Sequence, residues 1–383
     1  MRILSVNNLR LGASPANIPA FLTIDARAFS TRAAWQRAIS FVIRENIDTV
    51  LLSGDTFSST NHTFEPWGPL TDGLAELARA DVSVFAVERN DFNPLNLARF
   101  APEAEVAWIS ESLETDDTTI HIVAGSLAER ADAPVNNPIT LESIDEPNSI
   151  WILTDALQPD SVSAENAIVI EPGSASPLSA AETGRHGAWL IDTATRDVHL
   201  IPLANIEFAS VDIDIHAADD LDTLERTITA SLIDTANIAR NDGSIANTLL
   251  ADITLTGRSR LYPALAETAS ELQRMLVIEH EGVDITISRI IIDATPAIDL
   301  EPLLNRPDPV GEVARLIHAL DVGDLSETQQ RLLTNAEQKL LSVSHARVFG
   351  SVVDLNVEID APTLLRRQSW ATLDALVRQR GID

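Results

Sequence analysis

Residues 2–10, RILSVNNLR, and residues 49–57, TVLLSGDTF, decide the fold. Each is a short apolar run that ends in small and polar residues, a pattern typical of a buried strand leading into a loop. Between them, residues 31–45 carry apolar side chains at helical spacing. A second helix is predicted over 68–80 and a third strand over 82–87. This β-α-β-α-β order predicts an α/β sheet with its working loops at the carboxyl ends of the strands.

Two further regions follow in the sequence. Later strands are predicted over 119–124, 150–153, 167–170, 188–192 and 198–202. Because they follow one another closely, we expect them to form a second, more antiparallel sheet packed on the first. From about residue 206 the pattern predicts a small α/β unit, with strands over 211–216, 248–256 and 283–292 and helices over 221–237 and 261–275.

A proline-rich connector after Pro296 separates these regions from a helical end. Helices are predicted over 310–320, 326–341 and 362–380, with Ser326 as the N-cap of the middle one. The sequence therefore predicts three domains: an α/β sandwich flanked by helices (1–205), a small α/β capping domain (206–296) and a helical C-terminal region (297–383).

Composition narrows the class of protein. The chain has 383 residues, 45% of them hydrophobic, and no cysteine, so disulfides and thiolate metal sites are excluded. No apolar run approaches the roughly 18 residues that a membrane span needs. The N-terminus has the pattern of a strand rather than of a signal peptide, and we expect a cytoplasmic protein.

The net charge is strongly negative. The chain carries 57 acidic and 27 basic residues, a net charge of −30, and Lys339 is its single lysine. Such a surface repels phosphate backbones, so DNA is expected to bind weakly or through a partner. The acidity could serve solubility, including in a salty cytoplasm, or could complement a more basic partner.

The loops after the strands carry a recognisable set of motifs. Asn7–Gly12 follows the first strand, Gly54–Phe57 the second and Glu88–Asp91 the third, and Pro172–Ser179 reads PGSASPLS. These spacings resemble the calcineurin-like metallophosphoesterases, specifically the SbcD and YhaO type of DNA-repair nuclease. That family has the motifs D-x-H-L-G, G-D-x-F-D, G-N-H-D, a later lone histidine and G-H-x-H, followed by a PGS-x-x-P-L-S segment. The resemblance covers the whole chain and implies a metallophosphoesterase-like sandwich.

The family's chemistry uses two metal ions that clamp a phosphate and activate water. By resemblance, Asp55 matches the aspartate that bridges the two ions, and Asn90 matches the asparagine of G-N-H-D. Four positions depart from the pattern. Asn8 replaces the first aspartate, Arg10 the first histidine, Ser58 the last aspartate of G-D-x-F-D, and Asp91 the histidine of G-N-H-D.

The family's later histidines are also missing. The strand that should supply one continues into Thr154 and Asp155, and the G-H-x-H loop expected before Ala167 is absent. None of the eight histidines stands at a motif position. We therefore expect no cofactor and no catalytic residue.

Other residues could rebuild a simpler site. A vestigial active-site cleft is predicted where Asn8, Arg10, Asp55, Asn90, Asp91 and Asp155 converge. Its carboxylates could hold one Mg²⁺ or Mn²⁺ if the protein is active. Arg10 argues against a metal because a guanidinium cannot lose its proton. Our hypothesis is that Arg10 pairs with Asp55 or Asp91; the alternative is that it points to solvent. The Gly54-Asp55 pair has a second interpretation as ordinary turn chemistry.

The resemblance also implies a partner. Nucleases of this type work with an SMC-like coiled-coil ATPase (SbcC-like), which their C-terminal helices grip, and they dimerise through their core. A candidate contact is the apolar stripe Leu332, Leu333, Ala336, Leu340 and Leu341, which could equally pack on its own domain. The arginines of the last helix, Arg366, Arg367, Arg378 and Arg380, could serve capping and solvation or docking.

We therefore expect a non-catalytic, nuclease-derived subunit concerned with DNA repair or genome defence. Two alternatives stay open. One is an active metal-dependent exonuclease or phosphodiesterase with a rewired carboxylate site. The other is a stand-alone binding protein that has lost both catalysis and the ATPase.

Overall fold

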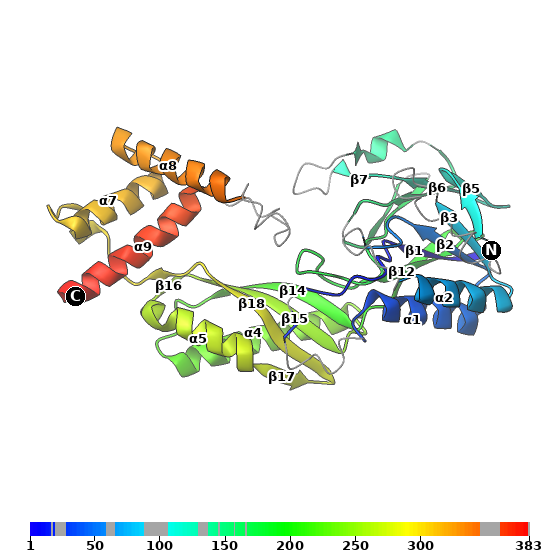
Figure 1. Ribbon diagram of the computed structural model, residues 1–383, viewed down its shortest axis with the longest axis horizontal. Coiled ribbons are helices and arrows are strands. Elements are labelled where there is room, and N and C mark those ends of the chain that lie inside the picture. The colour runs from blue at the N-terminus through cyan, green and yellow to red at the C-terminus, as the bar shows by residue number, and fades with distance from the viewer. Residues whose placement is uncertain are drawn as a thin grey trace. The chain divides into compact units, whose positions relative to one another are not determined.

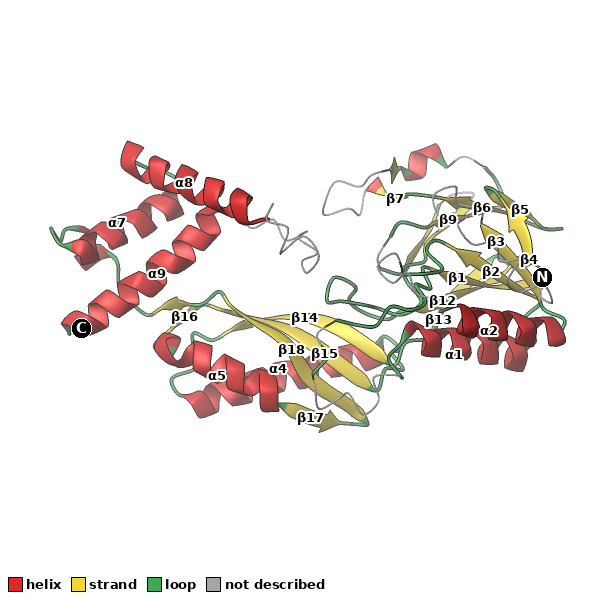
Figure 2. Ribbon diagram, viewed as in Figure 1, coloured by secondary structure: helices red, strands yellow, loops and turns green. Residues whose placement is uncertain are grey.

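The computed structural model describes residues 1–16, 18–19, 28–58, 66–87, 106–128, 137–144, 146–156, 158–164, 167–344 and 361–381. Within them the chain is a mixed α/β protein, as predicted (Figures 1 and 2). It divides into two compact units: residues 1–211, 230–253 and 273–289 form the first, and residues 212–229, 254–272 and 290–383 the second. The three-domain division stays a prediction.

The first sheet is built around the N-terminal strand. Its order is β13 (Asp197–Pro202), β12 (Gly187–Asp192), β1 (Arg2–Asn7), β2 (Thr49–Ser53), β3 (Ser83–Val87) and β4 (Val106–Ile109). Strands β1 to β4 are parallel, whereas β12 runs antiparallel to β1 with Ile191 opposite Ile3. The prediction that β12 and β13 belong to a second sheet was wrong. The apolar pattern of a strand does not reveal which neighbour it pairs with.

Helices α1 (Thr31–Glu45) and α2 (Trp67–Arg79) pack against this sheet (Figure 2). The side chain of Ser30 caps α1 by accepting the N–H of Ala33 at 3.3 Å, and Asn46 ends the helix in the left-handed conformation. Trp35 from α1 and Leu74 from α2 are fully buried in the core that these helices share with β1, β2 and β3. Both helices match their predicted positions.

The second sheet covers the other side of the first. Its order is β10 (Asp160–Ser163), β11 (Ala167–Glu171), β9 (Ser149–Leu153), β6 (Thr119–Val123) and β5 (Ser112–Glu114). Ile3 and Leu51 of the first sheet share one core with Ile120, Ile150 and Ile170 of the second, so the two sheets pack face to face. Strand β10 is not among the predicted strands, and it pairs antiparallel with β11.

Short elements pack on this sheet, where Leu127 and Ile144 share a core with Leu153 and Val169. Strands β7 (Ser126–Leu127) and β8 (Pro138–Ile139) pair with each other, and η3 (Leu141–Ser143) is a single 3₁₀ turn.

A third sheet contributes residues to both units. It contains β14 (Ile206–Asp214), β15 (Thr248–Thr256), β18 (Val283–Ile292) and β17 (Val277–His280), in that order, with helices α4 (Leu221–Asn241) and α5 (Tyr262–Met275). The short strands β16 (Arg258–Ser259) and β19 (Thr295–Pro296) pair in parallel. The predicted order is present, and β17 is an addition that the sequence pattern did not reveal.

The chain then forms α6 (Glu301–Leu304), α7 (Pro309–Val322), α8 (Glu327–Ser344) and α9 (Ala361–Arg380). Leu303, Val310, Ile317, Trp370 and Leu373 from α6, α7 and α9 form their core. The predicted cap at Ser326 is present: its hydroxyl accepts the N–H of Gln329 at 3.4 Å, and the Gln329 side chain accepts the N–H of Ser326 at 2.9 Å.

Helix α8 differs from its neighbours because none of its residues with a described side chain is buried. Leu332 is 49% exposed, and Leu333 and Ala336 are half-buried. The side chains of Leu340 and Leu341 lie outside the described residues. The described part of the predicted apolar stripe, Leu332, Leu333 and Ala336, is therefore not among the residues that form the core of α6, α7 and α9.

The arginines of α9 each bind a carboxylate of the same unit. Their partners are Asp321 for Arg366, Asp293 for Arg367, Asp374 for Arg378 and Asp308 for Arg380. These contacts favour the capping and solvation interpretation over docking.

None of the helices in the described ranges has the length and apolar character that crossing a membrane requires.

Candidate functional site

Loops from both sheets of the first unit meet where the strands end. The register of β1 and β2 sets Asn7 beside Ser53, so the residues that follow these strands emerge at the same edge. In the second sheet, β9 and β11 are also parallel, and they end at Leu153 and Glu171. The predicted meeting of Asn8 with Asp55 is present, because the two residues are joined by a hydrogen bond.

Asn7 links the two sheets. Its side chain is 1% exposed and donates from Nδ2 to the carbonyl oxygens of Gly173 at 2.8 Å and Thr154 at 3.3 Å. Its Oδ1 accepts the hydroxyl of Ser53 at 3.0 Å. The sequence did not point to Asn7, because it stands one position before the first motif residue and its acceptors lie far away in the sequence.

Asn8 uses both ends of its amide. Its Nδ2 donates to the carbonyl oxygen of Thr154 at 3.0 Å, and its Oδ1 accepts the backbone N–H of Asp55 at 2.9 Å. The residue lies at a φ of 43°, a left-handed conformation that asparagine tolerates better than most residues. Asn8 therefore connects three loops, those that follow β1, β2 and β9.

Gly54 permits this close approach. It has a φ of +64°, and a Cβ built on it would lie 2.3 Å from Oδ1 of Asn8 and 2.6 Å from Oδ1 of Asn7. Only glycine fits here. The observation supports the interpretation of Gly54-Asp55 as a turn, because the backbone conformation of this turn requires glycine at position 54.

The loops after β1 and β2 stay paired beyond the strands. The backbone N–H of Arg10 donates to the carbonyl of Asp55 at 2.8 Å, and that of Leu11 to Thr56 at 2.9 Å. Ser58 donates back to the carbonyl of Leu11 at 3.0 Å. Asp55 thus has both its N–H and its C=O engaged by the opposite loop.

The Arg10 side chain binds Glu182 and not Asp55, which corrects that part of the hypothesis; Asp91 lies outside the described residues. Nη1 donates to Oε1 of Glu182 at 2.9 Å, and Nη2 donates to Oε2 and to the carbonyl of Ser176 at 3.3 Å. The side chains are 19% and 5% exposed, so Arg10 does not point to solvent either. The guanidinium turns to Glu182 because that carboxylate is buried and needs a counter-ion.

Ser174 and His186 extend this pair. The Ser174 hydroxyl donates to Oε2 of Glu182 at 2.6 Å and lies 3.0 Å from Nδ1 of His186. Nδ1 also lies 3.1 Å from the Ser174 carbonyl, which can only accept, so Nδ1 carries the proton. Burial lowers the pKa of His186, with the nearby Glu182 carboxylate acting in the opposite direction. His186 is therefore a neutral residue within the core.

The set Arg10, Glu182, Ser174 and His186, here the Arg10 network, has no catalytic geometry. A serine nucleophile needs a base that is itself oriented by the acid, with the hydroxyl open to substrate. Here the hydroxyl of Ser174 contacts acid and imidazole at once, and Ser174 is 2% exposed. The network joins the loop after β1 to the turn after β11.

The described residues do not fit a dinuclear metal centre. Among them, no three His, Cys, Asp or Glu side chains gather as ligands would. Oδ1 of Asn8 already accepts an N–H, and Arg10 brings a permanent cation to the loop. Asp155 follows Thr154 and has its backbone N–H bonded to the carbonyl of Gly125 at 3.1 Å. Asn90 and Asp91, the remaining predicted site residues, lie outside the described residues.

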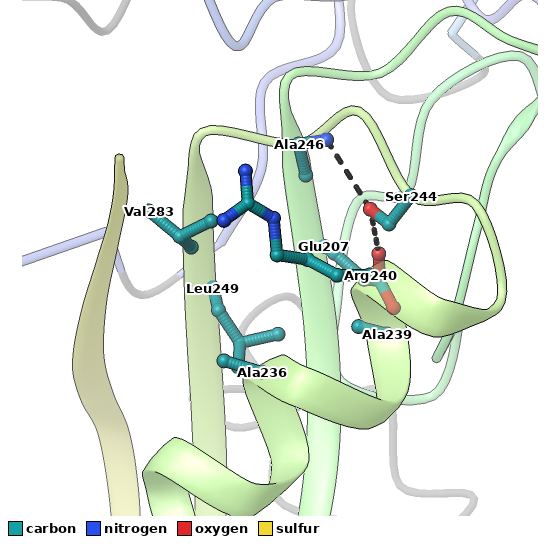
Figure 3. Close-up of a pocket in the computed structure, with 8 residues that line it drawn as sticks. All are labelled: Glu207, Ala236, Ala239, Arg240, Ser244, Ala246, Leu249 and Val283. Atoms are coloured by element: carbon teal, nitrogen blue, oxygen red, sulfur yellow. Dashed lines mark hydrogen bonds between the residues drawn. The ribbon is translucent and has the colours of Figure 1, made fainter. Parts of the chain in front are cut away.

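A small pocket lies elsewhere in the first unit. It has a volume of about 10 Å³, the space of one water molecule, and Figure 3 shows Glu207 and Ser244 in its wall. Burial raises the pKa of Glu207, which is 6% exposed, and its contact with the Ser244 hydroxyl opposes that rise. The pocket is too small for a substrate.

No protein-family model matches the chain, and a search of curated proteins finds no significant match. The functional class therefore depends on the residues themselves.

Proposed function

We propose that this protein is a non-catalytic member of the SbcD and YhaO type of metallophosphoesterase. In this proposal it is a cytoplasmic subunit that works with an SMC-like coiled-coil ATPase in DNA repair or genome defence. The observation that carries the proposal is the Arg10–Glu182 ion pair. It occupies the loop that in this family supplies a metal-binding histidine, and its Nη1–Oε1 distance is 2.9 Å.

The packing of the first unit supports the fold part of the proposal. Parallel strands with helices on one face and a second sheet on the other are what a metallophosphoesterase-like sandwich requires. In this proposal the strand-end loops correspond to the loops that bind metals in that family. Their polar atoms bind one another, as with Asn8 to Thr154 and Asp55, and this mutual bonding favours a structural role over a catalytic one.

Metal content and cleavage test the loss of catalysis. Purified protein incubated with Mn²⁺ is expected to retain no stoichiometric metal and to cleave neither linear duplex DNA nor bis-p-nitrophenyl phosphate. Asp55→Ala is then expected to match the wild type, as is the exposed control Asp116→Ala. Two bound ions per chain, or Mn²⁺-supported cleavage lost only in Asp55→Ala, would establish the rewired enzyme instead.

Substitutions in helix α8 test the proposed binding of a partner ATPase. Leu332 is exposed, and none of the described side chains of α8 is buried, so Leu332 offers apolar surface that could bind another protein. If a coiled-coil ATPase is encoded beside this protein, co-expression is expected to yield a complex. Leu332→Asp should break that complex, whereas Thr334→Asp, an exposed control on the same helix, should leave it intact. A neighbourhood without such an ATPase, or equal behaviour of both variants, favours the stand-alone binding protein.

A further inference from the structure

The chain holds far more carboxylates than its own cations can neutralise. It has 57 acidic and 27 basic residues, so pairing each base with one acid would still leave 30 carboxylates. Lysine is among the commonest residues of ordinary proteins, yet this chain has only Lys339. No rearrangement of side chains can remove this excess.

Many of the arginines are already paired. About half of those in the described ranges hold a carboxylate of the same unit, and several of these contacts are shorter than 3 Å. The paired arginines are Arg10, Arg44, Arg240, Arg289, Arg306, Arg315, Arg331, Arg366, Arg367, Arg378 and Arg380. Among the described residues, many of the remaining carboxylates are exposed to water, whereas a few, such as Glu171 and Glu207, are buried and bonded to neutral groups.

Exposed carboxylates also stand next to one another. Asp116 and Asp117 share the turn before β6, and Asp219, Asp222 and Glu225 lie around the start of α4, all of them exposed. Exposed charges of one sign repel over a Debye length, which is about 10 Å at 0.1 M salt and about 3 Å at 1 M. At low salt this self-repulsion opposes the compact state.

We infer that this protein is built to fold and work in concentrated salt, where monovalent cations screen its exposed carboxylates. The inference rests on charge and pairing, and it is independent of the proposed function. In this inference the acidic surface is an adaptation to a salty solvent and does not serve to bind a basic partner.

Urea unfolding of the full chain tests this inference. The unfolding is monitored by circular dichroism at KCl concentrations from 0.1 to 3 M. The wild-type midpoint is expected to rise by on the order of 1 M urea across that range. A neutralised variant, Asp116→Asn/Asp117→Asn/Asp222→Asn/Glu225→Gln, should unfold at higher urea than wild type in 0.1 M KCl and gain less from added salt. A charge-conserving control, Asp116→Glu/Asp117→Glu/Asp222→Glu/Glu225→Asp, should follow the wild type.

Added KCl could stabilise the protein by screening its charges or, like many solutes, by being excluded from its surface. Sucrose is uncharged and stabilises only by exclusion, so it distinguishes the two effects. Wild type and neutralised variant should gain equally from sucrose. A midpoint that does not change with KCl would overturn the inference. So would a neutralised variant that keeps the full salt dependence of the charge-conserving control.

Discussion

Breaking the Arg10–Glu182 pair is expected to destabilise the first unit markedly. Arg10→Met leaves the Glu182 carboxylate, 5% exposed, with the Ser174 hydroxyl as its remaining partner in the Arg10 network. Removing one partner of a fully buried pair costs about 3–5 kcal/mol. Because the Arg10 side chain is 19% exposed, water can reach part of the site, and we expect a loss of about 2–4 kcal/mol in the free energy of unfolding.

A double-mutant cycle separates the pair from its surroundings. Glu182→Gln keeps one acceptor oxygen for Ser174 and leaves the guanidinium its bond to the carbonyl of Ser176, so it should cost about 1–2 kcal/mol. The double variant should be more stable than the sum of the single losses predicts, by about 1–2 kcal/mol. Urea unfolding in one KCl concentration, followed by tryptophan fluorescence, measures all four proteins.

The exposed pair of Arg44 and Glu45 supplies the control. Its side chains are 67% and 41% exposed, so Arg44→Met should cost less than about 0.5 kcal/mol. If Arg10→Met costs no more than Arg44→Met, or if the two losses at Arg10 and Glu182 simply add, the buried ion pair is not what holds these loops.

Three further predictions concern turns and titrating groups. Gly54→Ala should cost about 2–4 kcal/mol, because its Cβ would overlap the side chains of Asn7 and Asn8; equal urea midpoints for Gly54→Ala and wild type would refute this. Asp308 has its pKa lowered to about 2 by Arg306, so its ionised form stabilises the fold above about pH 4 and that stabilisation is lost as the pH falls toward 2. Asp308→Asn should therefore be destabilising at pH 6 and match wild type near pH 2, by urea midpoints. Burial raises the pKa of Glu207, so the folded state loses stability as the pH rises through that value, and Glu207→Gln should be more stable than wild type at pH 7 but not at pH 4. An equal difference at both pH values would contradict the last prediction.

The elements were predictable because their patterns are local. Residues 31–45 and 248–256 occupy a helix and a strand with the predicted bounds. Pairing was less predictable, since β12 has the same apolar character whether it joins β1 or a second sheet. Strand β10 escaped notice because the segment Asp160–Ser163 is polar and gains its regular structure only from pairing with β11.

The candidate site was predictable only in part. Motif spacing brought Asn8 and Asp55 together, since both follow parallel strands. The partner of Arg10 was missed because Glu182 lies 172 residues away in the sequence and outside any strand. Nothing in the local sequence distinguishes an acid that will be buried from one that will face water. The link made by Asn7 was missed for the same reason, because its acceptors are backbone carbonyls of distant turns.

The exposed side chains of helix α8 can change at little thermodynamic cost. Since none of the described side chains of α8 is buried, substitutions at these positions leave the core of α6, α7 and α9 intact. In molar salt, charged contacts reach only about 3 Å, so a surface that must recognise another protein there has to do so through shape and apolar area. The exposed positions of this helix can therefore diverge in sequence, while the residues of the core stay under the constraint of folding.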